Sequence, residues 1–134
     1  MEQEDYLKRQ IDQLGRVFGK ILVDLLGLKS KGQVNIGIEI TNQMLKSELD
    51  FDIQELTDIR TDDFINTLLS EKKFNNDNFE KLAEILLLVA DSKAEKERKM
   101  LYEKCLTIFE YLEQTENVYS LDRQQKMARI KNSI

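Results

Sequence analysis

The stretch QVNIGIEITNQ, residues 33–43, decides the fold, because it can be read either as a strand or as a helix. Four β-branched residues stand at alternate positions in it: Val34, Ile36, Ile38 and Ile40. Such alternation is typical of a half-buried strand. A strand here would expose a sheet edge that recruits partners, whereas a helix would form one arm of a helical hairpin.

A helix accounts for more of this region than a strand does. At 3.6 residues per turn one face stays apolar for four turns, with Val34, Ile38, Thr41, Leu45 and Leu49 on it. A lone strand would leave its backbone groups unpaired, and no second strand is evident. β-Branched residues weaken a helix by only about a few tenths of a kcal/mol each. The sequence therefore predicts a helix, with Gly37 as the small residue that lets another helix come close.

The composition favours the same structure throughout the chain. The 134 residues are 41% hydrophobic and 34% charged, with no proline and five glycines, which suits long helices better than turn-rich β structure. We predict a single all-α domain over 1–134. It comprises an N-terminal heptad helix at 1–28 and a body of antiparallel helical hairpins at 33–134, with six or seven helices in all.

The N-terminal helix carries an apolar heptad seam that is wide enough for more than one neighbour. Its members are Leu7, Ile11, Leu14, Phe18, Ile21, Leu25 and Leu28, and Val17, Leu22 and Leu26 widen it. Either the helix lies across the other helices of the domain or part of it forms a subunit interface. For the second case the self-association candidates are Leu7, Ile11, Leu14 and Phe18. Gly15 and Gly19 either mark a close helix approach or are tolerated glycines.

Local signals place the later helices. Asp52, with Glu55 three residues later, resembles a capping box that opens a short helix. Thr61 is the expected cap of the next helix, and Asp77 that of a helix ending near Ala90. The AEILLLVA run, residues 83–90, is apolar around much of its circumference and predicts a central helix. Two further helices follow, of which the last is less apolar.

Chemical motifs are lacking. The chain has no histidine, and its one cysteine, Cys105, falls on an apolar stripe where a core role is expected. The segment DFDIQELTDIRT, residues 50–61, has acids at calcium-loop spacing but lacks the turn glycine and the final glutamate. We therefore predict no catalytic, cofactor-binding or metal-binding residue and no enzyme activity, and the sequence identifies no small-molecule ligand. A carboxylate-dependent enzyme is the least favoured alternative.

The net charge of −5 is unevenly distributed, with an acidic middle at residues 47–63 and a basic tail from residue 118. The negative sign disfavours nucleic-acid binding. An acidic N-terminus, no apolar run of about 18 residues and a single cysteine predict a cytoplasmic protein. Two tyrosines, Tyr111 and Tyr119, are candidates for a partner groove.

Two segments resemble the second helix of a tetratricopeptide-type hairpin. In MLYEKCLTIFEYLEQT, residues 100–115, the aromatic Tyr102 is followed three residues later by the small Cys105 and then by Leu106. QVNIGIEITNQMLK, residues 33–46, is similar, with Gly37 in the small-residue place. More broadly, the helix from Asp5 to Leu22 resembles the start of a group of small uncharacterised bacterial helical proteins with such hairpins. The resemblance implies a fold and a bacterial source, but no activity.

Together these features predict a non-enzymatic protein-interaction or scaffold module. Its protein partner is not identified by the sequence, and self-association as a homodimer is expected. The partner would dock in a groove between helix pairs. The alternative is a peripheral protein held at a membrane surface by the N-terminal amphipathic helix, where Lys8, Arg9, Arg16 and Lys20 accompany the apolar face.

Overall fold

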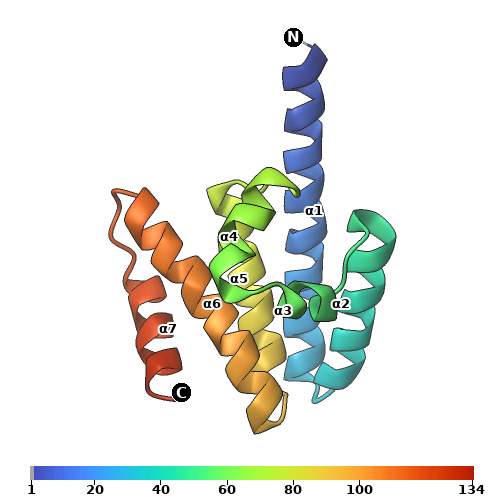
Figure 1. Cartoon of the computed structure of the whole chain (residues 1–134). Helices are drawn as coiled ribbons and strands as arrows, with labels where there is room; N and C mark the ends of the chain where they lie inside the picture. Colours follow the sequence, from blue (N-terminus) through green and yellow to red (C-terminus); the bar gives the residue numbers. More distant parts are fainter. Residues whose placement is uncertain (1) are drawn as a thin grey trace.

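The computed structural model describes residues 2–134, with side chains from residue 4 onward. Seven α-helices and no strand occur in this part of the chain (Figure 1). The prediction of an all-α fold, including a helix at residues 33–43, is confirmed. The helices are α1 (Glu2–Ser30), α2 (Val34–Leu49), α3 (Ile53–Asp58), α4 (Thr61–Ser70), α5 (Asn76–Ala90), α6 (Glu95–Thr115) and α7 (Leu121–Lys131).

Two pairs of long helices run antiparallel, α1 with α2 and α5 with α6 (Figure 1). In the first pair the Nε2 atom of Gln13 donates to the carbonyl of Glu48 at 3.4 Å, while Gly37 lies beside Leu25 at the other end. In the second pair the Phe79 and Tyr111 rings pack at a tilt of 56° with centroids 5.2 Å apart. The other end of that pair is closed by the Tyr102 hydroxyl, which donates to Asp91 at 2.7 Å.

The two pairs meet through α1 and α5, which run parallel. Asn78 donates to the carbonyl of Ile11 at 3.2 Å, and one turn further along both helices Lys81 donates to the carbonyl of Gly15 at 3.4 Å. The short helix α7 is also parallel to α5, because three successive pairs link them: Arg123 with Glu80, Lys126 with Glu84, and Arg129 with Asp91. Thus α1 and α7 flank α5 with all three helices pointing the same way.

The core forms where α5 is enclosed by its neighbours. Phe79, Leu82, Ile85, Leu86 and Val89 of this helix are all fully buried, which confirms the prediction that it is central. The seam of α1 packs against it, since Leu14, Phe18, Ile21 and Leu25 have exposed fractions of only 0 to 5%. Most of the α1 seam therefore lies in the core of its own chain. This agrees with the alternative in which the helix packs across the other helices of the domain.

Helix capping follows the sequence signals only in part. Asp52 accepts from the Glu55 backbone N–H at 2.8 Å, as predicted, but the Glu55 side chain contacts Lys46 instead of reaching back. The predicted cap at Asp77 is wrong, because Asn75 two residues earlier accepts from the Asn78 N–H at 2.9 Å. The predicted cap at Thr61 is also wrong: Thr61 is the first residue of α4, and its hydroxyl accepts from Lys104 at 3.0 Å.

Three helix glycines differ in what surrounds them. A Cβ atom at Gly37 would lie 2.9 Å from Cδ1 of the buried Leu25, so the absence of a side chain lets α2 pack closely on α1, as predicted. At Gly15 a Cβ would lie 3.3 Å from Asn78, and the missing side chain opens the α1 carbonyls to α5. A Cβ at Gly19 would have no neighbouring atom within 4 Å, so only Gly15 of this pair marks a close approach.

Alanine substitutions at Gly19 and Gly37 form a matched pair that tests this packing. Gly19→Ala should raise the free energy of unfolding by about 0.5–1 kcal/mol, because alanine is the better helix former and has room there. Gly37→Ala should not raise the free energy of unfolding, because the new methyl group overpacks Leu25 at a cost of about 1–3 kcal/mol, which offsets the gain in helix propensity. Urea unfolding of both variants measures the difference, and equal stabilisation would show that α2 does not need the glycine.

Candidate functional site

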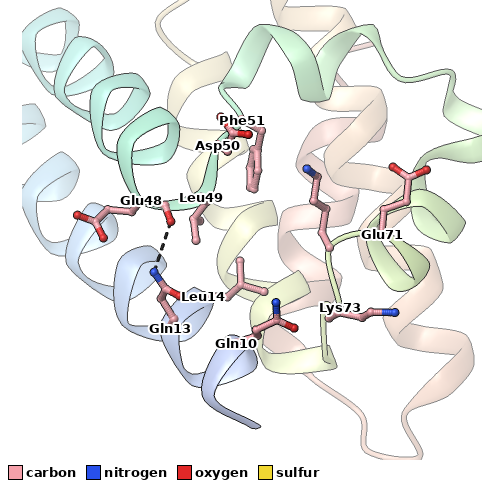
Figure 2. A pocket seen from close by; sticks show the side chains of 10 residues that line it. Gln10, Gln13, Leu14, Glu48, Leu49, Asp50, Phe51, Glu71 and Lys73 are labelled. Carbon is pink, nitrogen blue, oxygen red and sulfur yellow. Dashed lines mark hydrogen bonds between the residues drawn. The ribbon is translucent and has the colours of Figure 1, made fainter. Parts of the chain in front are cut away.

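The first candidate is a polar hollow of about 310 Å³ between the N-terminal half of α1 and two loops (Figure 2). Gln10, Gln13 and Leu14 come from α1, and Glu48 and Leu49 from the end of α2. The α2–α3 connection adds Asp50 and Phe51, and the segment after α4 adds Glu71, Lys72 and Lys73. The lining mixes both signs of charge.

The backbone beside this hollow has a structural explanation. Asp50 and Lys73 adopt left-handed conformations with φ of 62° and 58°, which non-glycine residues seldom do. Each is followed at once by a buried phenylalanine, Phe51 or Phe74, with exposed fractions of 3% and 5%. The left-handed residue thus turns the chain so that the next ring enters the core. This conformation serves packing and does not indicate a ligand.

The second candidate is an apolar groove in which α5 forms the floor and α1 and α7 form the walls. We call it the leucine groove; its volume is about 350 Å³. It is lined by Leu22, Leu26 and Lys29 of α1, Glu84, Leu87, Leu88 and Asp91 of α5, and Lys126 and Arg129 of α7. Leu26 is 52% exposed, and the neighbouring Val23 is 71% exposed. Leu26 therefore faces the open groove, and Leu22 and Leu88 are part-buried beside it.

Ion pairs hold the α7 side of the leucine groove in place. Arg129 makes two hydrogen bonds to Asp91, at 3.1 and 3.2 Å, which raise the pKa of its guanidinium. Burial alone would lower the pKa of Lys126, but its contacts with Asp122 at 2.8 Å and Glu84 at 3.2 Å outweigh that effect and raise it. Both side chains stay positively charged at the edge of the groove.

Arg123 anchors α7 more deeply. Its side chain is only 4% exposed and contacts three carboxylates, Glu80 of α5 at 3.2 Å, Glu113 of α6 at 3.0 Å and Glu116 at 3.3 Å. Burial acts to lower its pKa, and the hydrogen bonds to Glu80 and Glu113 more than compensate, so the pKa is raised. In the sequence this residue belongs to a basic tail. In the structure it is buried and forms ion pairs that connect α7 to α5 and α6.

The predicted self-association residues separate into two groups. Leu14 and Phe18 belong to the core, with exposed fractions of 5% and 0%, so they are not available at the surface. Ile11 is half-buried and Leu7 is 39% exposed. The burial of the seam also leaves little of this apolar face for a membrane surface. Self-association and membrane association both stay predictions, and they now rest on the exposed parts of α1.

The predicted groove tyrosines do not line the leucine groove. Tyr111 is half-buried with its ring against Phe79, and Tyr119 is 71% exposed in the connection between α6 and α7. The sequence did contain a signal for the groove that the structure has. Leu22 and Leu26 lie off the heptad positions and line the groove, where Leu22 is part-buried and Leu26 is 52% exposed.

Metal ligands do not gather in the described part of the chain. No group of three or more candidate metal ligands occurs among its residues. Cys105 is fully buried, and burial raises the pKa of its thiol. Across residues 2–134, none of the helices is long and apolar enough to cross a membrane.

Comparisons with protein-family models, curated proteins and solved structures find no match to this chain. The resemblance to bacterial helical-hairpin proteins thus stays a prediction, as does the cytoplasmic location.

Arg123→Met should detach α7 and lower the free energy of unfolding by about 3 kcal/mol, because it leaves three carboxylates without their buried cation. Lys126→Met is the control, with an expected loss below about 1 kcal/mol, since its partners are more exposed. Urea unfolding and amide hydrogen exchange in α7 measure both effects. Equal losses in the two variants would contradict the anchoring role of Arg123.

The buried thiol should make the fold sensitive to alkali. Above about pH 8.5 the unfolded chain loses the Cys105 proton while the folded chain keeps it, so the unfolded state binds fewer protons. The free energy of unfolding should then fall by about 1.4 kcal/mol per pH unit from this group. Cys105→Ala should reduce that slope between about pH 9 and 10.5 in urea titrations. An unchanged slope would show that the thiol ionises in the folded protein.

Proposed function

We propose that this chain is a non-enzymatic protein-interaction module, tetratricopeptide-like in architecture, that docks a segment of a protein partner in the leucine groove. The observation that carries the proposal is the groove itself, where the exposed Leu26 and the part-buried Leu22 and Leu88 lie between charged edges. Amphipathic helices commonly bind in grooves of this kind, with apolar residues on the floor and polar groups at the rim.

The helix arrangement supports the tetratricopeptide-like part of the proposal. Tetratricopeptide repeats are helix–turn–helix units whose stacking produces a binding surface. In this chain α1 with α2 and α5 with α6 are two antiparallel pairs, and their first helices lie side by side and parallel. Helix α7 adds a third parallel helix on the same face. The leucine groove is the surface that these three helices share.

The charges of the groove favour an acidic partner. Its rim has three cations, Lys29, Lys126 and Arg129, against two acids, Glu84 and Asp91, and both acids are already paired with α7. Lys126 and Arg129 are paired with these acids, so the lining residues sum to +1 through Lys29, although the whole chain carries −5. A partner helix with a leucine stripe and glutamates beside it complements both the floor and the rim.

A designed peptide provides a direct test. We expect a helical peptide with leucines at i, i+3, i+4 and i+7 and flanking glutamates to shift the methyl NMR signals of Leu22, Leu26 and Leu88. The same peptide with lysines for glutamates should bind roughly tenfold more weakly or worse, because the rim is positive.

Two surface variants complete the test. Leu26→Asp should weaken binding of the acidic peptide at least tenfold. Val118→Asp, which changes an exposed apolar residue outside the groove, should leave it within twofold. Absence of methyl shifts in the groove, or equal effects of the two substitutions, would refute the docking site.

A further inference from the structure

We infer that the occupant of the leucine groove is the N-terminal end of α1 from a second copy of this chain. The inference rests on the proposed function, because it names the partner for the same groove. It joins two features that are otherwise unexplained: an open apolar groove and an exposed helix end that carries apolar side chains.

The helix end projects from the body. In Figure 1 the first turns of α1 extend beyond all the other helices. Residues 4–9 are all exposed, and they include Tyr6 at 61% and Leu7 at 39%. A few helical turns without tertiary contacts are only marginally stable in water, since most helix stability comes from packing of an apolar face. Docking would supply the contacts that this end of α1 lacks within its own chain.

The apolar residues of the two surfaces match. Leu7 and Ile11 lie one turn apart on one face of the projecting end, and Glu4 is three residues before Leu7 on the same side. In the groove, Leu22 and Leu26 of the α1 wall and Leu88 of the floor are apolar, and Lys29 is a cation at the rim. Leucine would meet leucine and Glu4 would meet Lys29, with Lys8 and Arg9 of the same end directed away from the rim.

The dimensions match as well. The segment from Glu4 to Gln10 extends over about 9 Å at 1.5 Å per residue. The α1 wall of the groove, from Leu22 to Lys29, extends over about 10 Å by the same rise. The projecting end is thus about as long as the α1 wall of the groove.

The contact closes into a dimer. The projecting end and the groove lie at opposite ends of α1, so an antiparallel arrangement of two α1 helices brings each end to the groove of the other copy. This arrangement has two-fold symmetry and leaves neither groove empty. Both contacts form together, which makes the pair stronger than one contact alone.

Complementation between two variants tests the exchange. We expect the full chain to be a dimer by light scattering at micromolar concentration. Leu7→Asp and Leu26→Asp, which change exposed side chains, should each raise the dimer dissociation constant at least tenfold, while the exposed control Tyr119→Asp should not. Mixing the two variants should restore association in part, because the mixed pair has one intact contact, between Leu7 of one copy and the groove of the other, whereas each variant alone has none. Circular dichroism checks that each variant is folded.

The outcomes separate this inference from the proposed function. A monomeric wild-type chain whose groove still binds the acidic peptide would refute the exchange and leave the docking site standing. A monomer that does not bind the peptide would refute both. A dimer that neither variant disrupts, or a loss that mixing does not even partly restore, would place the dimer contact elsewhere and overturn the exchange.

Discussion

The burial of one face of α1 is the constraint on which the other packing depends. This face is too wide for one neighbour, so α2 covers one side and α5 the other. Two glycines make both contacts close: Gly37 admits Leu25, and Gly15 exposes α1 carbonyls to Asn78 and Lys81. Once α5 is fixed against α1, α6 and α7 can dock on its remaining sides. The strip of α1 around Leu26 stays uncovered and becomes the wall of the leucine groove.

The features that sequence reasoning predicted are local ones. The helix at residues 33–43, the central α5 and the cap at Asp52 each depend on residues within a few turns of one another. The wrong cap at Asp77 also has a local reason, since several capping residues stand next to each other in NNDN and the chain can begin its helix at more than one of them. The leucine groove was not predicted because it joins segments near residues 22–29, 84–91 and 126–129. The heptad periodicity likewise predicted that Leu14 and Phe18 are buried, but it did not indicate whether their own chain or a second copy buries them.

The two walls of the leucine groove are held by different forces. The α1 wall is fixed by apolar burial, because Phe18 and Leu25 on its inner face are fully enclosed. The α7 wall depends largely on charge, with Arg123 buried among carboxylates and Lys126 and Arg129 paired nearer the surface. Salt screens surface pairs more than buried ones. The end of α7 near Arg129 is therefore the part of the groove whose position responds most to ionic strength.

The parallel course of α1, α5 and α7 has an electrostatic consequence. Each helix carries a partial positive charge at its N-terminus and a partial negative charge at its C-terminus, and side-by-side parallel dipoles repel. The charged residues oppose this repulsion: Asp77 and Asp122 stand in the first turns of α5 and α7, and Lys29, Arg129 and Lys131 in the last turns of α1 and α7. Helix α5 ends instead at Asp91, and Arg129 of the neighbouring helix supplies the missing cation there. The acidic and basic residues thus neutralise opposite poles of one three-helix layer.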